Sequence, residues 1–165
     1  MVASHPSAPG YLFKKYADDI SQKEQSANYE ARIAGASRLA ELIRRERLQH
    51  VLVPRKHLHD LPRSFGEPRV LVVERLDIVG RDESERHYYD VADGVLRELL
   101  RVLVAFPGLD SNSKNIQFTR TGKIAFVDLE NWGRKDRDEV RLKSIGSYLS
   151  KDKRKIARTI LDELT

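Results

Sequence analysis

Short apolar runs predict three strands in the first half of the chain. Residues 11–16 combine aromatic and aliphatic side chains after Gly10, and residues 50–54 and 69–73 are rich in valine. Each run is too short for a packed helix, and β-branched and aromatic residues favour the extended backbone. We therefore expect a β-strand in each of these three places.

Apolar residues recur at helical spacing in three longer segments. Ser21 and Glu24 have the form of a capping box, and the apolar stripe that follows predicts a helix over residues 22–47. A longer stripe, ended by a Pro-Gly pair, predicts one helix over residues 85–106. A third helix is expected from about residue 151, where apolar residues again lie on one face.

The second half of the chain also predicts a β-hairpin. Residues 115–119 and 123–127 alternate between apolar and polar positions, as strands with one buried face do. The short loop between them contains Gly122, which can adopt the positive φ that such a loop often needs. We expect the two strands to pair in an antiparallel sense.

The remaining segments are polar. Residues 1–9 are small, polar and proline-containing, so we expect a loose tail, and residues 57–68 are expected to form an irregular connection. The order of elements predicts an α+β fold. We expect one domain over residues 10–165, with a small sheet and a helix over residues 10–76 and a mainly helical part over residues 77–165.

Composition excludes several classes of protein. A chain of 165 residues has room for one domain, and 40% hydrophobic with 33% charged residues is typical of a globular protein with a charged surface. The absence of cysteine excludes disulfides, thiolate metal sites and a cysteine nucleophile. Nothing approaches the roughly 18 consecutive apolar residues that a membrane-spanning helix needs.

The net charge of +5 favours a polyanionic partner, and nucleotide phosphates are one such partner. The basic clusters at residues 44–47 and 151–155 are not interleaved with aromatic residues, so they are expected to be solvated faces, and a nucleic acid is not the expected partner. The first ten residues lack the basic and apolar regions of a secretory signal. We expect a cytoplasmic protein, or one exported into a host cell by a signal of another kind.

Three polar residues carry the candidate chemistry. Asp110 follows the long predicted helix, Asn115 comes five positions later, and Asp128 ends the second hairpin strand. Phosphoryl transfer needs a carboxylate to accept the proton of the attacking hydroxyl, and a carboxylate with an amide oxygen to hold magnesium. Because a hairpin folds the chain back on itself, these three side chains can meet. For Asp110 and Asn115, ordinary turn formation is the alternative interpretation.

This segment resembles the protein-kinase superfamily. The kinase catalytic loop is H-R-D-L-x-x-x-N and is followed by D-F-G; Asp110 and Asn115 match its Asp and Asn in spacing, and Asp128 stands where D-F-G would be. The resemblance implies that Asp110 is the catalytic base, that Asn115 and Asp128 are magnesium ligands, and that ATP is the phosphoryl donor.

The first half of the chain resembles the amino-terminal lobe of the same family. Lys14, which follows an apolar residue, is similar to the lysine of the V-A-I-K strand, and Glu30 lies on the following predicted helix, where the family has its ion-pair partner. Residues 71–76 resemble the hinge, whose backbone holds the adenine, which implies that Glu74 and Leu76 are adenine-binding positions. Lys14 would then be the phosphate anchor.

The chain also departs from the family pattern. Nine residues before Gly10 are too few for the two strands of a glycine-rich loop, Gly108-Leu109 stands in place of H-R, and Asp128-Leu-Glu130 stands in place of D-F-G. The resemblance covers about residues 10–130, so the expected fold is a minimal kinase-like domain with a reduced carboxy-terminal lobe.

Three functions remain open from the sequence. The first is a minimal phosphotransferase that moves the γ-phosphoryl group of ATP, with magnesium, to a hydroxyl on a protein, alone or with an activating protein partner. The second is a pseudokinase that serves as a nucleotide- or protein-binding module, which the missing phosphate-covering loop favours. The third is an unrelated basic α+β module that binds nucleic acid.

Overall fold

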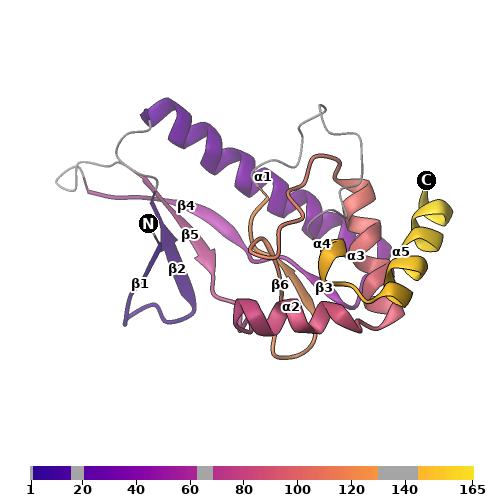
Figure 1. The fold of residues 1–165 in the computed structure, drawn as a ribbon. Coiled ribbons are helices and arrows are strands. Elements are labelled where there is room, and N and C mark those ends of the chain that lie inside the picture. Colours follow the sequence, from indigo (N-terminus) through magenta and orange to yellow (C-terminus); the bar gives the residue numbers. More distant parts are fainter. Residues whose placement is uncertain (1, 16–20, 63–68, 130–144) are drawn as a thin grey trace.

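The computed structural model describes residues 2–15, 21–62, 69–129 and 145–165. These parts contain five helices and two small sheets, so the predicted α+β class is confirmed. The strands are β1 (Val2–Ser4), β2 (Tyr11–Lys14), β3 (Val51–Leu52), β4 (Lys56–Asp60), β5 (Arg69–Glu74), β6 (Ile116–Phe118) and β7 (Ile124–Phe126). The helices are α1 (Gln22–Glu46), α2 (Arg81–Tyr89), α3 (Asp93–Ala105), α4 (Ile145–Tyr148) and α5 (Lys151–Leu164). In Figure 1 the sheet that contains β1, β2, β4 and β5 lies at one end of the molecule, and α3 and α5 lie at the other.

The first sheet is antiparallel, in the order β1-β2-β5-β4. Its register pairs Leu12 with Val73 and Lys56 with Val73, so these three side chains share one face of the sheet. Leu71 and Val73 on that face form a small core with Tyr29 of α1. The amino-terminal half of α1 therefore covers this face.

The second sheet has the order β3-β7-β6 and contains the predicted hairpin. β6 and β7 are antiparallel, with Ile116 opposite Phe126, and Gly122 in the connecting loop has a φ of 76°. β3 lies parallel to β7, with Val51 opposite Ile124. The hairpin prediction is confirmed, and the sheet attaches it to the segment that follows α1.

α1 has the ends that the sequence predicts. The Ser21 side chain accepts a hydrogen bond from the backbone of Glu24, the Glu24 side chain reaches back to Ser21, and Arg47 closes the helix in the left-handed conformation. The carboxy-terminal half contributes Leu39 and Leu42 to the main core. α1 therefore joins the two sheets, and none of the described helices is both long and apolar enough to cross a membrane.

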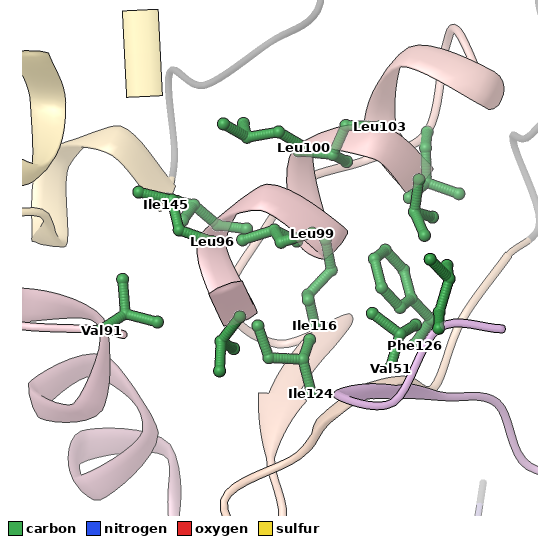
Figure 2. Close-up of a cluster of buried hydrophobic side chains, with 14 of the residues drawn as sticks. Val51, Val91, Leu96, Leu99, Leu100, Leu103, Ile116, Ile124, Phe126 and Ile145 are labelled. Carbon is green, nitrogen blue, oxygen red and sulfur yellow. The ribbon is translucent and has the colours of Figure 1, made fainter. Parts of the chain in front are cut away.

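The main core surrounds α3. Leu96, Leu99 and Leu100 are fully buried there, and Figure 2 shows them between the helical part and the second sheet, where Ile116 and Phe126 face them. α5 packs on α3 from the other side, with Ala157 and Ile160 buried. The packed core therefore supports both the loop before the hairpin and the residues that follow it.

Two polar segments differ from their predictions. β4 occupies part of the expected connection, because Leu58 and the stem of Lys56 point to α1 while His57 and His59 remain exposed on the other face. This alternation is that of an edge strand with one wet face. The expected loose tail contains β1, which pairs with β2 and gives the first sheet its fourth strand.

The long helix expected over residues 85–106 is two helices. α2 begins earlier, at Arg81, and ends at Tyr89, and α3 starts again at Asp93. The buried side chains of α2 are Ser84 and Tyr88. Both carry a hydroxyl group, so they do not appear as a stripe of apolar residues in the sequence. α2 is held against the hairpin both by hydrogen bonds and by the Tyr88 ring, which packs on Phe118 in the main core.

Candidate functional site

The loop after α3 brings Asp110 and Asn115 together. Asp110 Oδ1 accepts a hydrogen bond from the backbone N–H of Asn112 (3.2 Å), and Asp110 Oδ2 accepts one from Asn115 Nδ2 (3.1 Å). Gly108 enters the loop with a φ of 87°, in the left-handed region that favours glycine. The first bond is an Asx turn, so the carboxylate shapes the loop while it remains exposed.

Asp128 lies next to this loop. The backbone N–H of Val127 donates to the carbonyl of Asn115 (2.8 Å), which continues the hairpin ladder to the residue before Asp128. The Asp128 carboxylate is 23% exposed and forms an ion pair with Arg32 Nη2 of α1 at 3.2 Å. The hairpin therefore sets Asn115 beside the residue before Asp128, while the Asp128 carboxylate contacts Arg32, a partner from α1 that was not foreseen.

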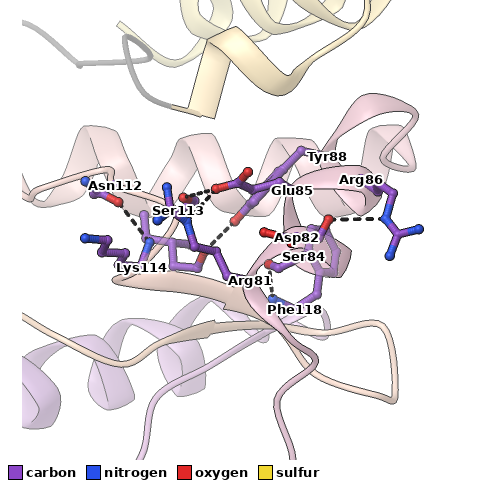
Figure 3. Close-up of polar contacts among 11 residues, drawn as sticks. Arg81, Asp82, Ser84, Glu85, Arg86, Tyr88, Asn112, Ser113, Lys114 and Phe118 are labelled. Carbon is purple, nitrogen blue, oxygen red and sulfur yellow. Dashed lines mark hydrogen bonds and ion pairs between the residues drawn. The ribbon is translucent and has the colours of Figure 1, made fainter.

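α2 holds the hairpin strand in place. Figure 3 shows Ser84 Oγ at the backbone N–H of Phe118, from which it accepts a hydrogen bond (2.9 Å). The Tyr88 hydroxyl donates to the carbonyl of Ile116 (2.9 Å). Burial raises the pKa of the Tyr88 hydroxyl, so this group stays a donor. Both atoms are buried, so the two bonds fix the position of β6 next to α2.

A second contact from α2 reaches the candidate loop. The Glu85 carboxylate accepts hydrogen bonds from Arg81 Nε and from Ser113 Oγ, both at 2.8 Å. These bonds, with that from Arg81 the stronger influence, lower the pKa of Glu85, so it accepts as a carboxylate. Ser113 is buried, and it stands between Asp110 and Asn115 in the sequence. Its hydrogen bond to Glu85 therefore anchors the middle of the loop to α2.

Lys56 of β4 is a second cation near Asp128. Its ammonium donates to the carbonyl of Val127 (3.0 Å). Burial lowers the pKa of Lys56 to about 8, and the charges of Lys14 and Arg32 lower it further, while Asp128 opposes them. Four charged side chains, from β2, α1, β4 and the segment after β7, therefore lie close enough to influence one another.

Lys14 and Glu30 are not brought together. Lys14 lies on the face of the first sheet that α1 covers, close enough to Lys56 to influence its pKa. Glu30 is exposed, and within the described ranges no hydrogen bond or ion pair joins it to Lys14. The buried positions Tyr29 and Ala36 mark the inner face of α1, and at 100° per residue Glu30 falls outside it while Arg32 falls inside.

The hinge-like segment lines an open groove. Leu76 forms part of its wall with Leu12, Ile78 and residues of β1, around a volume of about 710 Å³. Glu74 points elsewhere: its carboxylate accepts hydrogen bonds from the backbone and side chain of Arg55, and mainly the backbone bond lowers the pKa of Glu74. Leu76 is thus placed to contact a ligand, whereas the Glu74 side chain connects β5 to the start of β4.

The donor set suits magnesium held together with phosphates. In the described residues no three His, Cys, Asp or Glu side chains gather as a cluster that would hold a metal by themselves. Magnesium commonly uses only one or two protein oxygens and takes the rest from phosphate and water. Asp128 supplies a carboxylate, and the amide oxygen of Asn115 is the end that does not bind Asp110. Glu130, the last residue of the D-L-E comparison, lies outside the described residues.

Sequence reasoning missed Arg32 and Lys56. Lys56 lies between an apolar strand and a histidine-rich stretch, and only its alternation with Leu58 indicates that it points inward. Arg32 is three residues after Tyr29 and four before Ala36, so a helical wheel centred on those two residues would have placed it on the inner face.

The buried ammonium predicts a pH-dependent stability difference. Because the pKa of Lys56 is lowered from 10.5 to about 8, the unfolded chain binds more protons than the folded one between these pH values. The wild type should therefore gain stability relative to Lys56→Met as the pH rises through this window, by on the order of 3 kcal/mol. Urea unfolding at several pH values measures the difference.

Lys123→Met is the matched control, since that side chain is exposed in the hairpin loop and reports what the loss of an exposed lysine does. The stability difference between the wild type and Lys56→Met should not stay constant from pH 8 to 10.5, and it should not follow the difference measured for Lys123→Met. Either result would show that Lys56 is not held in a desolvated site.

Comparison with known proteins gives no relative. No protein-family model matches the chain, and no curated protein matches it significantly in sequence. The function must therefore be argued from the site itself.

Proposed function

We propose that the protein is a minimal kinase-like phosphotransferase that moves the γ-phosphoryl group of ATP to a hydroxyl group on a protein. The observation that carries this proposal is the side-chain bond between Asn115 and Asp110, together with the Val127–Asn115 backbone bond, which sets Asn115 beside the residue before Asp128. A spacing that arose by chance would not be expected to coincide with a hairpin that brings the residues close.

The arrangement of the first sheet also supports a kinase-like fold. β2, which contains Lys14, lies beside β5, which leads into the hinge-like segment, and α1 covers their common face. The groove at Leu76 opens next to this segment. A nucleobase in the groove would lie on the same sheet face as Lys14, which is the relation that the family resemblance implies.

Each residue has a role in the proposed reaction. The Asp110 carboxylate is exposed and would accept the proton of the attacking hydroxyl as its oxygen bonds to phosphorus. Asp128 and the Asn115 amide oxygen would hold magnesium, which when bound neutralises charge on the phosphates. Ser113 and Glu85 keep the loop in place by their hydrogen bond.

A second candidate function is a pseudokinase that binds nucleotide or protein without catalysis. The Arg32–Asp128 ion pair favours it, because the carboxylate proposed as a metal ligand already has a cationic partner. Such a module would bind ATP with little dependence on magnesium and would transfer nothing.

Nucleotide binding is the first test. Thermal unfolding with and without ATP and magnesium should show stabilisation, about 2.7 kcal/mol at a ligand concentration of 100 Kd. Incubation with γ-labelled ATP in cell lysates then tests transfer. Stabilisation by ATP without labelled product in any lysate would favour the pseudokinase, and no stabilisation at all would end both proposals.

The substitution Asp128→Asn tests the metal role. It removes the ligand charge but keeps the side-chain volume, so ATP affinity measured with magnesium should fall by about tenfold or more, while affinity measured in EDTA changes little. Isothermal titration under the two conditions measures both values.

Asp162→Asn is the control for the lost charge, because Asp162 is exposed on α5. A wild-type affinity for ATP that is the same in EDTA and in magnesium would contradict the metal role of Asp128 directly.

A further inference from the structure

Two cations converge on Asp128 from distant parts of the chain. Arg32 comes from the middle of α1, and its Nη2 lies 3.2 Å from the Asp128 carboxylate. Lys56 comes from the start of β4, and its Nζ lies 3.0 Å from the carbonyl of the preceding residue, Val127. The two cations and the carboxylate thus share one place, where the first sheet, α1 and the end of β7 meet.

We propose that Arg32 and Lys56 form an anion subsite that binds the phosphate oxygens of a polyphosphate ligand. The inference rests on the proposed function in that it takes ATP to be the physiological source of the polyphosphate. It extends that function by assigning phosphate binding to a helix arginine and a β4 lysine, neither of which corresponds to a position of the family motifs.

The electrostatics of the subsite favour an anion. Lys56 is largely withdrawn from water, and the charges of Lys14 and Arg32 oppose its protonation. Keeping the ammonium charged in this position therefore costs free energy. One described carboxylate, Asp128, acts in the favourable direction. A phosphate oxygen placed between the cations would offset the repulsion.

The two side chains have the chemistry that phosphates need. The guanidinium of Arg32 presents a planar set of donors that matches carboxylate and phosphate alike, so the group that now contacts Asp128 can also contact a phosphate. Lys56 acts as a compact point charge with three donors, one of which is used by the carbonyl of Val127.

The position of the subsite connects it to the metal ligands. Val127 accepts from Lys56 through its carbonyl and donates to Asn115 through its N–H, so the ammonium and Asn115 lie on either side of the residue before Asp128. The Asp128 carboxylate lies with the cations, next to Arg32, so a phosphate bound by the two cations would lie beside one of the proposed metal ligands.

Binding of inorganic tripolyphosphate in EDTA tests the subsite without a nucleobase or a metal. Titration calorimetry should show that Lys56→Gln and Arg32→Gln bind it about 10- to 100-fold more weakly than the wild type, which is the usual effect of losing a hydrogen bond to a charged group. Arg44→Gln, exposed on the same helix, and Lys123→Gln, exposed in the hairpin loop, are matched controls and should bind as the wild type does.

Arg32→Lys guards against a folding defect, since it keeps the charge opposite Asp128 and should retain part of the affinity. If Arg32→Gln does not fold, Lys56→Gln and Arg32→Lys decide the question. Tripolyphosphate binding that is no weaker in Lys56→Gln than in Lys123→Gln would overturn the proposal.

A parallel titration with ATP and magnesium separates this inference from the proposed function. If Asp128→Asn weakens ATP binding but Lys56→Gln does not, the subsite is wrong and the proposed function stands. If Lys56→Gln weakens tripolyphosphate binding, while ATP binds no more tightly than tripolyphosphate and ignores magnesium, the subsite stands and the proposed function falls.

Discussion

Replacement of Asp110 by asparagine should reduce phosphoryl transfer by about 10²- to 10⁴-fold, the usual contribution of a positioned general base. Asparagine keeps an oxygen that can accept from the backbone of Asn112, so the turn is retained, but it cannot take a proton at neutral pH, and its amide nitrogen cannot accept from Asn115 Nδ2. The loss in transfer should therefore exceed any loss in ATP affinity that the changed Asn115 contact causes. Transfer of label from γ-labelled ATP and a parallel binding titration measure the two effects.

Asp110→Ala distinguishes the base from the turn residue. Alanine removes both functions, so it should lose transfer as asparagine does and also lose about 1 kcal/mol of stability. If the carboxylate only shapes the loop, Asp110→Asn should transfer as the wild type does and only Asp110→Ala should be impaired. That outcome would remove Asp110 from the proposed mechanism.

The largest effect on stability is expected from Phe126→Ala, at about 3–5 kcal/mol in the free energy of unfolding. Phe126 of β7 is fully buried, and Figure 2 shows it in the cluster that contains Val51 of β3 and the leucines of α3. Its removal leaves a cavity where the second sheet meets the helical part. Urea unfolding followed by circular dichroism measures the loss.

Tyr89→Ala is the control, because Tyr89 is 64% exposed and its removal should change stability by no more than about 0.5 kcal/mol. A loss below about 1 kcal/mol for Phe126→Ala would mean that β7 does not pack against α3 in solution as it does here.

The part of the site that local geometry determines could be predicted from the sequence. A tight loop relates Asp110 to Asn115, and a two-stranded hairpin relates Asn115 to Asp128, so spacing along the chain translates directly into proximity. The same holds for α1, whose ends follow from the capping box and from the extent of the apolar stripe. These relations need no knowledge of the remaining fold.

The part that depends on helix phase and sheet register could not be predicted. Glu30 and Arg32 are separated by about 200° around α1, so a small error in the inner face exchanges one charge for the other. Lys56 faces Asp128 only because β4 pairs with β5 in a register that sets Lys56 opposite Val73. That pairing involves β4, whose polar sequence gives no apolar signal.

The contacts between α2 and β6 also block strand pairing between two copies of the protein. β6 is the outer strand of its sheet, and an outer strand offers unpaired backbone groups to a strand of another molecule. Here the carbonyl of Ile116 and the N–H of Phe118 are already bound by Tyr88 and Ser84, and the carbonyl of Phe118 by the N–H of Val79. Loss of both α2 side chains would free this edge for intermolecular strand pairing, and aggregation could then occur without prior unfolding of the core.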